Sequence, residues 1–356
     1  MCTMAKAKKA IKTSPKKSLP SEIRMAVIGY GGAFNMGKAH ASWGQAAPGF
    51  RFVAACDIDP ARAAAAAEDF PGIETYTDVD TMLRKCDFDL VTIVTPHNTH
   101  APLAIQCARA GKHVVVEKPM CITTQEGTDM IAAAKKAGTC LTVFHNRRHD
   151  GDYLAVKEIV DKGMIGDVFK VEMCMGGYDA PGTWWRSDKA ISGGAFYDWG
   201  AHILDWLLHV VPQRIEHVMG YFHKLVWHQM TNEDHVHAVI KFVNGATADV
   251  QLSTIQRIGK PRWRILGTKG AIVDTGQGKF HVVTELKGMV VEMDVPYRQS
   301  SWQNFYDNLS AHLLKGKPLE VTPESARRVI AIMEAAEVSS QTGQPQPVPY
   351  DDTLHL

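Results

Sequence analysis

Residues 25–40 read MAVIGYGGAFNMGKAH, an apolar strand that breaks into a glycine-rich turn and continues as helix-like sequence. Gly29 and Gly31 allow a tight turn, and unpaired N–H groups at the start of the following helix can bind a dinucleotide's pyrophosphate. The third glycine, Gly37, comes three residues later than G-x-G-x-x-G requires, so we expect a longer lip over the phosphates. The cofactor-binding residues expected here are Gly29, Gly31, Gly32, Ala33, Phe34, Asn35 and Met36.

The next apolar strand ends in an acid. Residues 52–56 read FVAAC, and Asp57 follows them, about one strand–helix–strand unit beyond the glycine turn. A carboxylate there can accept hydrogen bonds from both ribose hydroxyls of the adenosine half, and it would repel a 2′-phosphate. We therefore expect NAD before NADP as the cofactor. The alternative is that the glycines belong to an ordinary turn.

Length and charge limit the classes of protein to consider. The 356 residues are enough for two domains with filled cores. The 39 Lys and Arg residues against 38 Asp and Glu give a net charge of +1, so no overall charge indicates a nucleic-acid partner. The exception is the lysine-rich head, and we expect residues 1–22 to form a disordered basic tail rather than a targeting arm.

Neither a membrane span nor a disulfide framework is expected. The sequence has no run of 18 apolar residues. Its seven cysteines are scattered and include no C-x-x-C pair. An odd number of scattered cysteines is typical of free thiols in a reducing compartment, so we expect a cytoplasmic protein.

The pattern of elements predicts two domains. Apolar strands alternate with helical segments up to about residue 145, which indicates a doubly wound parallel sheet, a Rossmann NAD-binding domain over residues 23–148. Residues 149–356 read as an α+β domain with an open, mainly antiparallel sheet, and Asn244-Gly245 marks a hairpin turn. We expect this domain to bind substrate and to carry the contacts between subunits. Two final helical segments, 302–317 and 323–340, are expected to pack back on the first domain.

Two short segments carry side chains suited to hydride-transfer chemistry. Glu117-Lys118-Pro119 follows a strand at the carboxyl edge of the parallel sheet, where the nicotinamide is expected. Lys118 could hydrogen-bond a substrate hydroxyl and lower its pKa, while Glu117 pairs with the lysine. The alternative is a surface Glu–Lys pair at a strand end.

The second segment, residues 193–206, reads GGAFYDWGAHILDW. If it is helical, Asp198 and His202 lie one turn apart on one face, where the histidine could take a hydroxyl proton near neutral pH. Asp198 would bind another hydroxyl or orient the ring. Asp205 and His209 continue this face, but no third ligand converges with them, so no metal is expected. The alternative for His202 is a hydrogen-bonded core histidine.

Together these features resemble the Gfo/Idh/MocA family, named after glucose–fructose oxidoreductase, inositol dehydrogenase and a rhizopine-catabolism protein. The resemblance rests on the glycine turn, the T-P-x-x-x-H segment at 95–100, the E-K-P triplet and the G-G-x-x-x-D-x-G-x-H element ending at His202. It implies a catalytic trio of Lys118, Asp198 and His202, a sugar or polyol substrate, and a homodimer or homotetramer formed through the C-terminal sheet. It also implies that Thr95, Pro96, His97, His100, Glu117 and Lys118 contact the cofactor. The lengthened glycine turn departs from the usual spacing of the family.

Other polar and aromatic residues are candidates for holding the substrate. Trp184 and Trp185 could stack on a sugar face and Arg186 could hold a carboxylate or hydroxyl, although adjacent tryptophans often only pack a loop onto the body. Asn146 and Arg147 follow the last strand of the first domain and could face the cleft. For this arginine and the next one, ion pairs between the domains are an equal alternative.

The leading interpretation is an NAD-dependent oxidoreductase that acts on a CH–OH group of a sugar, glycoside or polyol. The second is a redox-neutral glycosidase or lyase that uses tightly bound NAD through a transient keto-sugar. The third is a non-catalytic NAD-binding regulator, which would not need the trio. The expected partner is a small-molecule substrate, with no nucleic acid and no membrane.

Overall fold

The computed structural model describes residues 19–350, so most of the expected basic tail lies outside the described residues. The N-terminal domain is a parallel sheet in the order β3-β2-β1-β4-β5-β6. Its strands are β1 (Ile23–Ile28), β2 (Phe50–Cys56), β3 (Glu74–Tyr76), β4 (Leu90–Ile93), β5 (His113–Val116) and β6 (Leu141–Val143). Strands β1, β4 and β5 are apolar and almost fully buried because helices cover both faces of the sheet.

The order of the strands fixes where a ligand can bind. Strand β1 pairs with both β2 and β4, so the chain changes direction there and leaves a crevice at the carboxyl ends of these strands. The connections of this domain are α1 (Met36–Ala46), α2 (Pro60–Asp69), α3 (Val79–Lys85), the short 3₁₀ helix η1 (His97–Thr99), α4 (His100–Arg109) and α5 (Thr124–Ala137). The side chain of Asp59 caps α2, with Pro60 at its first position, as the sequence predicts.

The C-terminal domain is built on an eight-stranded sheet in the order β14-β13-β12-β11-β7-β10-β9-β8. Only the β7–β10 pair is parallel, so the predicted doubly wound domain joined to a mainly antiparallel one is confirmed. The strands are β7 (Val168–Gly176), β8 (Ile215–His223), β9 (His235–Phe242), β10 (Thr247–Ser253), β11 (Trp263–Gly267), β12 (Gly270–Asp274), β13 (Lys279–Leu286) and β14 (Met289–Pro296). Asn244-Gly245 turns β9 into β10, as expected.

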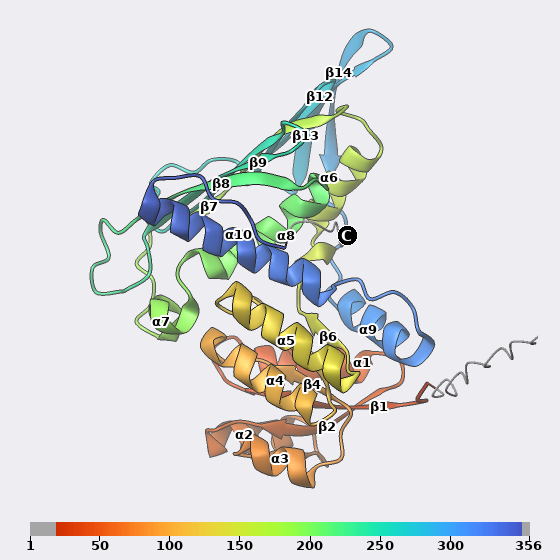
Figure 1. The fold of residues 1–356 in the computed structure, drawn as a ribbon. Helices are drawn as coiled ribbons and strands as arrows, with labels where there is room; N and C mark the ends of the chain where they lie inside the picture. Colours follow the sequence, from red (N-terminus) through yellow and green to blue (C-terminus); the bar gives the residue numbers. More distant parts are fainter. Residues whose placement is uncertain (1–18, 351–356) are drawn as a thin grey trace, which may run out of the picture.

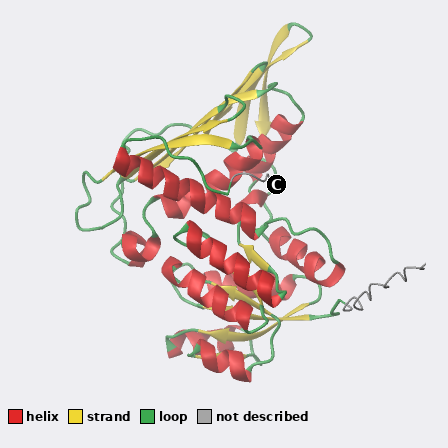
Figure 2. Cartoon of the chain, viewed as in Figure 1, coloured by secondary structure: helices red, strands yellow, loops and turns green. Residues whose placement is uncertain are grey.

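Helices lie between the two sheets. Figure 1 shows α8 and α10 between the eight-stranded sheet and the N-terminal domain, and Figure 2 shows the helical layers in the same view. Helix α10 packs on both β8 and α5, and α9 packs on α1, so the last helices touch both halves of the chain. The remaining helices are η2 (Asn146–His149), α6 (Gly151–Asp161), η3 (Trp185–Ser187), α7 (Lys189–Ser192), α8 (Phe196–Val210), α9 (Gln303–Lys315) and α10 (Pro323–Thr342).

Candidate active site

A cavity of about 1310 Å³ lies where the carboxyl ends of the parallel strands face the second domain. Residues from both domains line it. All of the residues singled out in the sequence as cofactor or substrate contacts are among them: Gly29, Gly31, Gly32, Ala33, Phe34, Asn35, Met36, Asp57, Thr95, Pro96, His97, His100, Glu117, Lys118, Asn146, Arg147, Trp184, Trp185, Arg186, Asp198 and His202. The fold therefore gathers these separate segments around one space.

The glycine turn has the geometry of a phosphate cradle. Gly29 has φ +88°, and a Cβ on it would lie 2.6 Å from the Val94 carbonyl oxygen, so only glycine fits there. Asn35 adopts a left-handed conformation before α1 and makes no side-chain cap, and the first turn of α1 holds no acidic residue. The N–H groups at this helix start are therefore left to bind an anion, which fits a dinucleotide's pyrophosphate.

At the adenosine end, Asp57 is held by the backbone. Its carboxylate accepts hydrogen bonds from the N–H groups of Gly31 (2.8 Å) and Asp59 (2.9 Å). The Arg62 guanidinium lies against Gly32, so close that a Cβ there would be 2.4 Å from its Cζ. An acid and a cation thus flank the expected ribose position. The sequence indicates the acid, but no motif marks Arg62 as a cofactor residue.

Lys118 and Asp198 meet across the two domains. Lys118 Nζ donates to Asp198 Oδ1 at 2.6 Å and to the Asp198 carbonyl oxygen at 3.3 Å. Burial alone would raise the pKa of Asp198, but the Lys118 ammonium, with help from Arg186 and His97, outweighs it and lowers this pKa to about 2. The Asp198 carboxylate is therefore ionised at neutral pH. The pair brings together residues 80 positions apart in the chain.

Glu117 has a different partner from the expected one. Its carboxylate accepts the Lys118 backbone N–H at 2.8 Å and contacts His40 Nε2 at 3.0 Å, rather than pairing with the Lys118 ammonium. The other nitrogen of His40 bonds Tyr306 Oη at 2.8 Å. Glu117 thus fixes the backbone that carries the lysine and leaves the ammonium to Asp198.

His202 lies one turn after Asp198 on α8, and only 4% of its surface is exposed to solvent. Burial lowers the pKa of His202 well below its usual value, and the Lys118 charge lowers it further, so the ring is neutral near pH 7. Among the described residues, its Nδ1 is enclosed and has no hydrogen-bond partner. The Asp198 carboxylate bonds Lys118 and does not orient the His202 ring. Of the two roles expected for Asp198, orienting the ring is therefore wrong.

An aromatic contact joins the two domains at the cavity. The Phe34 ring of the lengthened lip lies 5.4 Å from the Trp184 ring of the loop before α7. The Arg186 guanidinium stacks over Trp185 at 4.4 Å and lies 5.1 Å from both the Phe34 and Trp184 rings. The inserted residues therefore reach the opposite wall of the cavity.

The two arginines after β6 differ in their surroundings. Arg147 lines the cavity, stacks on Trp199 at 4.4 Å and forms an ion pair with Asp150 at 2.7 Å. Arg148 is buried and donates to both carboxylate oxygens of Asp205, at 2.7 and 2.8 Å. Asp205 is therefore half of an ion pair between η2 and α8. No group of side chains suited to a metal ion occurs within residues 19–350.

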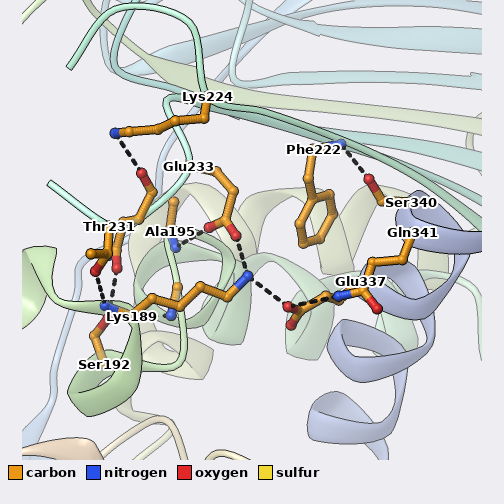
Figure 3. Close-up of polar contacts among 12 residues, drawn as sticks. Lys189, Ser192, Ala195, Phe222, Lys224, Thr231, Glu233, Glu337, Ser340 and Gln341 are labelled. Carbon is orange, nitrogen blue, oxygen red and sulfur yellow. Dashed lines mark hydrogen bonds and ion pairs between the residues drawn. The ribbon is translucent and has the colours of Figure 1, made fainter. Parts of the chain in front are cut away.

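Glu233 is a cavity residue that the sequence analysis missed. Its carboxylate accepts the Ala195 N–H at 3.0 Å, immediately before α8 begins. Lys189 joins Glu233 to Glu337 of α10, as Figure 3 shows. This strut fixes the start of the helix that carries Asp198. Glu233 lies in a connection between two strands, where no local pattern marks it.

Comparison with known proteins agrees with this geometry. Residues 23–145 match the family described as oxidoreductase family, NAD-binding Rossmann fold, and residues 153–273 match the GFO/IDH/MocA C-terminal domain. The chain belongs to the Gfo/Idh/MocA family. The resemblance drawn from the glycine turn, the E-K-P triplet and the histidine element is thereby confirmed.

Similar members of the family include two dehydrogenases from Bacillus subtilis. The chain is 28% identical to scyllo-inositol 2-dehydrogenase (NAD(+)) over 91% of its own length and 96% of the relative's. It is 27% identical to scyllo-inositol 2-dehydrogenase (NADP(+)) IolW over 77% of its length and 82% of the relative's. A solved NAD-binding protein from Listeria innocua is 28% identical, with a TM-score of 0.82 over 94% of this chain and 100% of the other. Both nicotinamide cofactors thus occur among these relatives.

A membrane-crossing helix is absent from the part of the chain that the structure describes, because no helix there is both long and apolar enough.

Proposed function

We propose that this Gfo/Idh/MocA protein is an NAD-dependent dehydrogenase that oxidises a CH–OH group of a sugar, glycoside or polyol. The observation that carries the proposal is the convergence of Lys118 from one domain with Asp198 and His202 from the other, in the cavity that contains the glycine lip. Lys118 follows β5 and His97 follows β4. Asp57 follows β2, on one side of β1, whereas β4 and β5 lie on the other side. The nicotinamide half of a dinucleotide is expected at the ends of β4 and β5.

Each member of the trio has a separate task in this mechanism. Bound NAD⁺ supplies the hydride acceptor. Lys118 donates a hydrogen bond to the reacting oxygen and stabilises the negative charge that develops as its proton leaves. His202 is neutral and takes that proton, while Asp198 holds the ammonium in place and accepts a hydrogen bond from a neighbouring hydroxyl.

The walls of the cavity suit a polyhydroxylated ring. Trp184, Trp185 and Arg186 line the cavity from one loop, and Asn146 and Arg147 line it just after the last strand of the first domain. Aromatic rings pack against the C–H faces of a sugar, and the arginines and the amide donate to its oxygens. We propose these five residues as the substrate contacts. Binding in a fixed orientation would supply much of the rate acceleration.

Formation of NADH tests the proposed reaction. Purified protein is incubated with NAD⁺ and a panel of free sugars and polyols that includes scyllo-inositol, and NADH absorbance is followed. Steady accumulation of NADH with at least one of them is the expected result. A complete lack of NADH with the whole panel, from protein that binds NAD⁺, contradicts the dehydrogenase.

One observation favours the redox-neutral glycosidase or lyase as a second candidate. The contact between Phe34 and Trp184 joins the two walls of the cavity and would slow release of the cofactor, as a reaction that recycles its own NAD requires. The same preparation is therefore incubated with aryl glycosides and no added NAD⁺. Release of the aglycone without net NADH would support this second reaction instead of the first.

The choice between NAD and NADP is a prediction about Asp57. We expect the wild-type protein to bind NADH more tightly than NADPH, because the carboxylate repels a 2′-phosphate. Replacing Asp57 by serine is expected to shift the ratio of the two dissociation constants toward NADPH by roughly 10- to 100-fold, the weight of one charged hydrogen-bonding group. Quenching of tryptophan fluorescence measures both constants without any substrate.

Arg62 provides the matched control for this experiment. Its guanidinium lies at Gly32, next to the Gly31 N–H that bonds Asp57, and a nearby arginine can accommodate the 2′-phosphate. Adding Arg62→Ala to the Asp57→Ser protein is expected to cancel most of the gain in NADPH binding. An Asp57→Ser protein with an unchanged ratio would remove Asp57 as the discriminating residue.

We also propose that subunits associate through the open face of the eight-stranded sheet and that the protein is cytoplasmic. Alternate residues of β8–β10 are buried under the helices, while the others, such as Tyr221 and Val239, stay partly exposed on the far face. The six described cysteines are free thiols, which suits a reducing compartment. Light scattering of the wild-type and Tyr221→Asp proteins tests the association, and cell fractionation tests the location.

A further inference from the structure

The two nitrogens of the His202 ring have different surroundings. His202 lines the cavity, but its Nδ1 is enclosed and has no hydrogen-bond partner among the described residues. Nε2 is therefore the nitrogen that a substrate hydroxyl can reach. A neutral imidazole that accepts a proton at Nε2 carries its own proton on Nδ1. The proposed reaction thus requires a buried N–H group that lacks an acceptor, and such a group is destabilising if it stays unpaired.

A second buried histidine lies next to this ring. His145 follows β6, is 2% exposed, and lies edge-to-face with His202 at 83°, with the ring centroids 6.4 Å apart. Its Nδ1 is also enclosed and unpartnered within the described part of the chain. This nitrogen lies 4.0 Å from Asp205 Oδ2, too far for a hydrogen bond. The Nδ1–H group of His202 thus lacks an acceptor, and Nδ1 of His145 lacks a donor.

We propose that His145 is a positioning residue for His202, joined to it through one ordered water that the Asp205 carboxylate also holds. This inference rests on the proposed function, in which His202 is the base. A centroid separation of 6.4 Å is too long for direct contact of two ring nitrogens. A buried water needs two to four polar partners, and the two Nδ1 atoms with Asp205 supply three.

The surrounding charges favour moving positive charge from His202 toward Asp205. Lys118 and Arg147 both oppose protonation of His202. Burial also disfavours protonation of His145 and lowers its pKa to about 4. The charges of Arg148, His209 and Lys118 act in the same direction, whereas the Asp205 carboxylate favours protonation. Asp205 stays ionised because Arg148 more than offsets the effect of burial on its pKa. An imidazolium is therefore better stabilised at His145 than beside Lys118.

The proton path balances with hydride transfer. The substrate O–H bond breaks and its proton goes to Nε2 of His202. The Nδ1 proton of His202 passes through the water to Nδ1 of His145. Bound NAD⁺ would accept the carbinol C–H hydride, so the products would be a carbonyl compound and NADH, with the released proton on His145. Reversal of the same path serves the reduction.

The tautomer of His202 tests the inference without any turnover. Protein labelled with nitrogen-15 in its histidines is saturated with NAD⁺, and the ring-nitrogen shifts of His202 are recorded by NMR. We expect the Nδ1–H tautomer in the wild-type protein and in His145→Gln, whose amide oxygen can still accept through the water. In His145→Phe the Nε2–H form is expected to rise at least severalfold. His209→Phe, which alters another histidine near Asp205, is the matched control and should match the wild type.

Two results would overturn the inference. One is a wild-type His202 found in the Nε2–H tautomer, which needs no variant and so does not depend on how the variants fold. The other is an unchanged tautomer ratio in folded His145→Phe. If scyllo-inositol is a substrate, the acid limb of the pH profile of kcat/KM should be shifted in His145→Phe. In His145→Gln this limb should lie at its wild-type position. A failure of every polyol counts against the proposed function alone, because the NMR result still decides the role of His145.

Discussion

Replacing Lys118 by methionine is expected to lower kcat/KM for polyol oxidation about 10³-fold, within the usual range for a group that assists proton transfer. Methionine keeps most of the length and apolar stem of the lysine and removes only the ammonium. The Asp198 carboxylate then loses the partner that lies 2.6 Å away, and the reacting oxygen loses its hydrogen-bond donor. Initial rates of NADH formation, measured with the best polyol of the panel, give the change.

The control separates the role of Lys118 from general damage to the fold. Lys136→Met changes an exposed lysine on α5 and should leave kcat/KM unaltered. The Lys118→Met protein should still bind NADH, since the glycine lip and Asp57 are intact. A Lys118→Met protein with near wild-type kcat/KM would show that the ammonium takes no part in the reaction.

The second large effect concerns stability. Asp205→Leu is expected to lower the free energy of unfolding by about 3–5 kcal/mol, because it leaves the buried Arg148 guanidinium without its counter-charge. Both partners are almost fully buried, and the guanidinium contacts both carboxylate oxygens. Urea denaturation followed by circular dichroism measures the loss.

A double substitution tests the cause. Arg148→Met combined with Asp205→Leu removes both charges and should recover most of the lost stability, since an apolar pair of similar volume avoids the cost of burying an unpaired ion. If the double variant is as unstable as the sum of the two single variants, the ion pair is not the source of the effect.

The features that the sequence predicted are those with a local signal. The glycine turn, Asp57 and the E-K-P triplet occupy fixed places at the ends of parallel strands, so the order of the strands places them along one edge. Asp198 and His202 are four residues apart on a helix, so their common face follows from helical geometry. The family resemblance added the connection between the two segments. Periodicity alone could not have placed Lys118 beside Asp198.

The features that were missed depend on contacts between distant parts of the chain. His40 meets Glu117 across 77 positions, whereas the sequence suggested a pair between Glu117 and the adjacent lysine. Glu233 reaches the start of α8 from 38 positions away, from a connection without periodicity. Arg62 lies on a helix that reads as ordinary surface, and only its packing on Gly32 brings it to the cofactor edge. Such pairings follow from tertiary packing and leave no pattern in the sequence.

The Phe34–Trp184 contact has a kinetic consequence. These two cavity-lining rings come from the two halves of the protein, so we expect a bound nucleotide to depart only after the rings separate. Opening steps of this kind commonly limit the overall cycle in enzymes with closing loops. Maximal velocities would then be similar for good and mediocre alcohols, and preference among them would appear chiefly at low concentration.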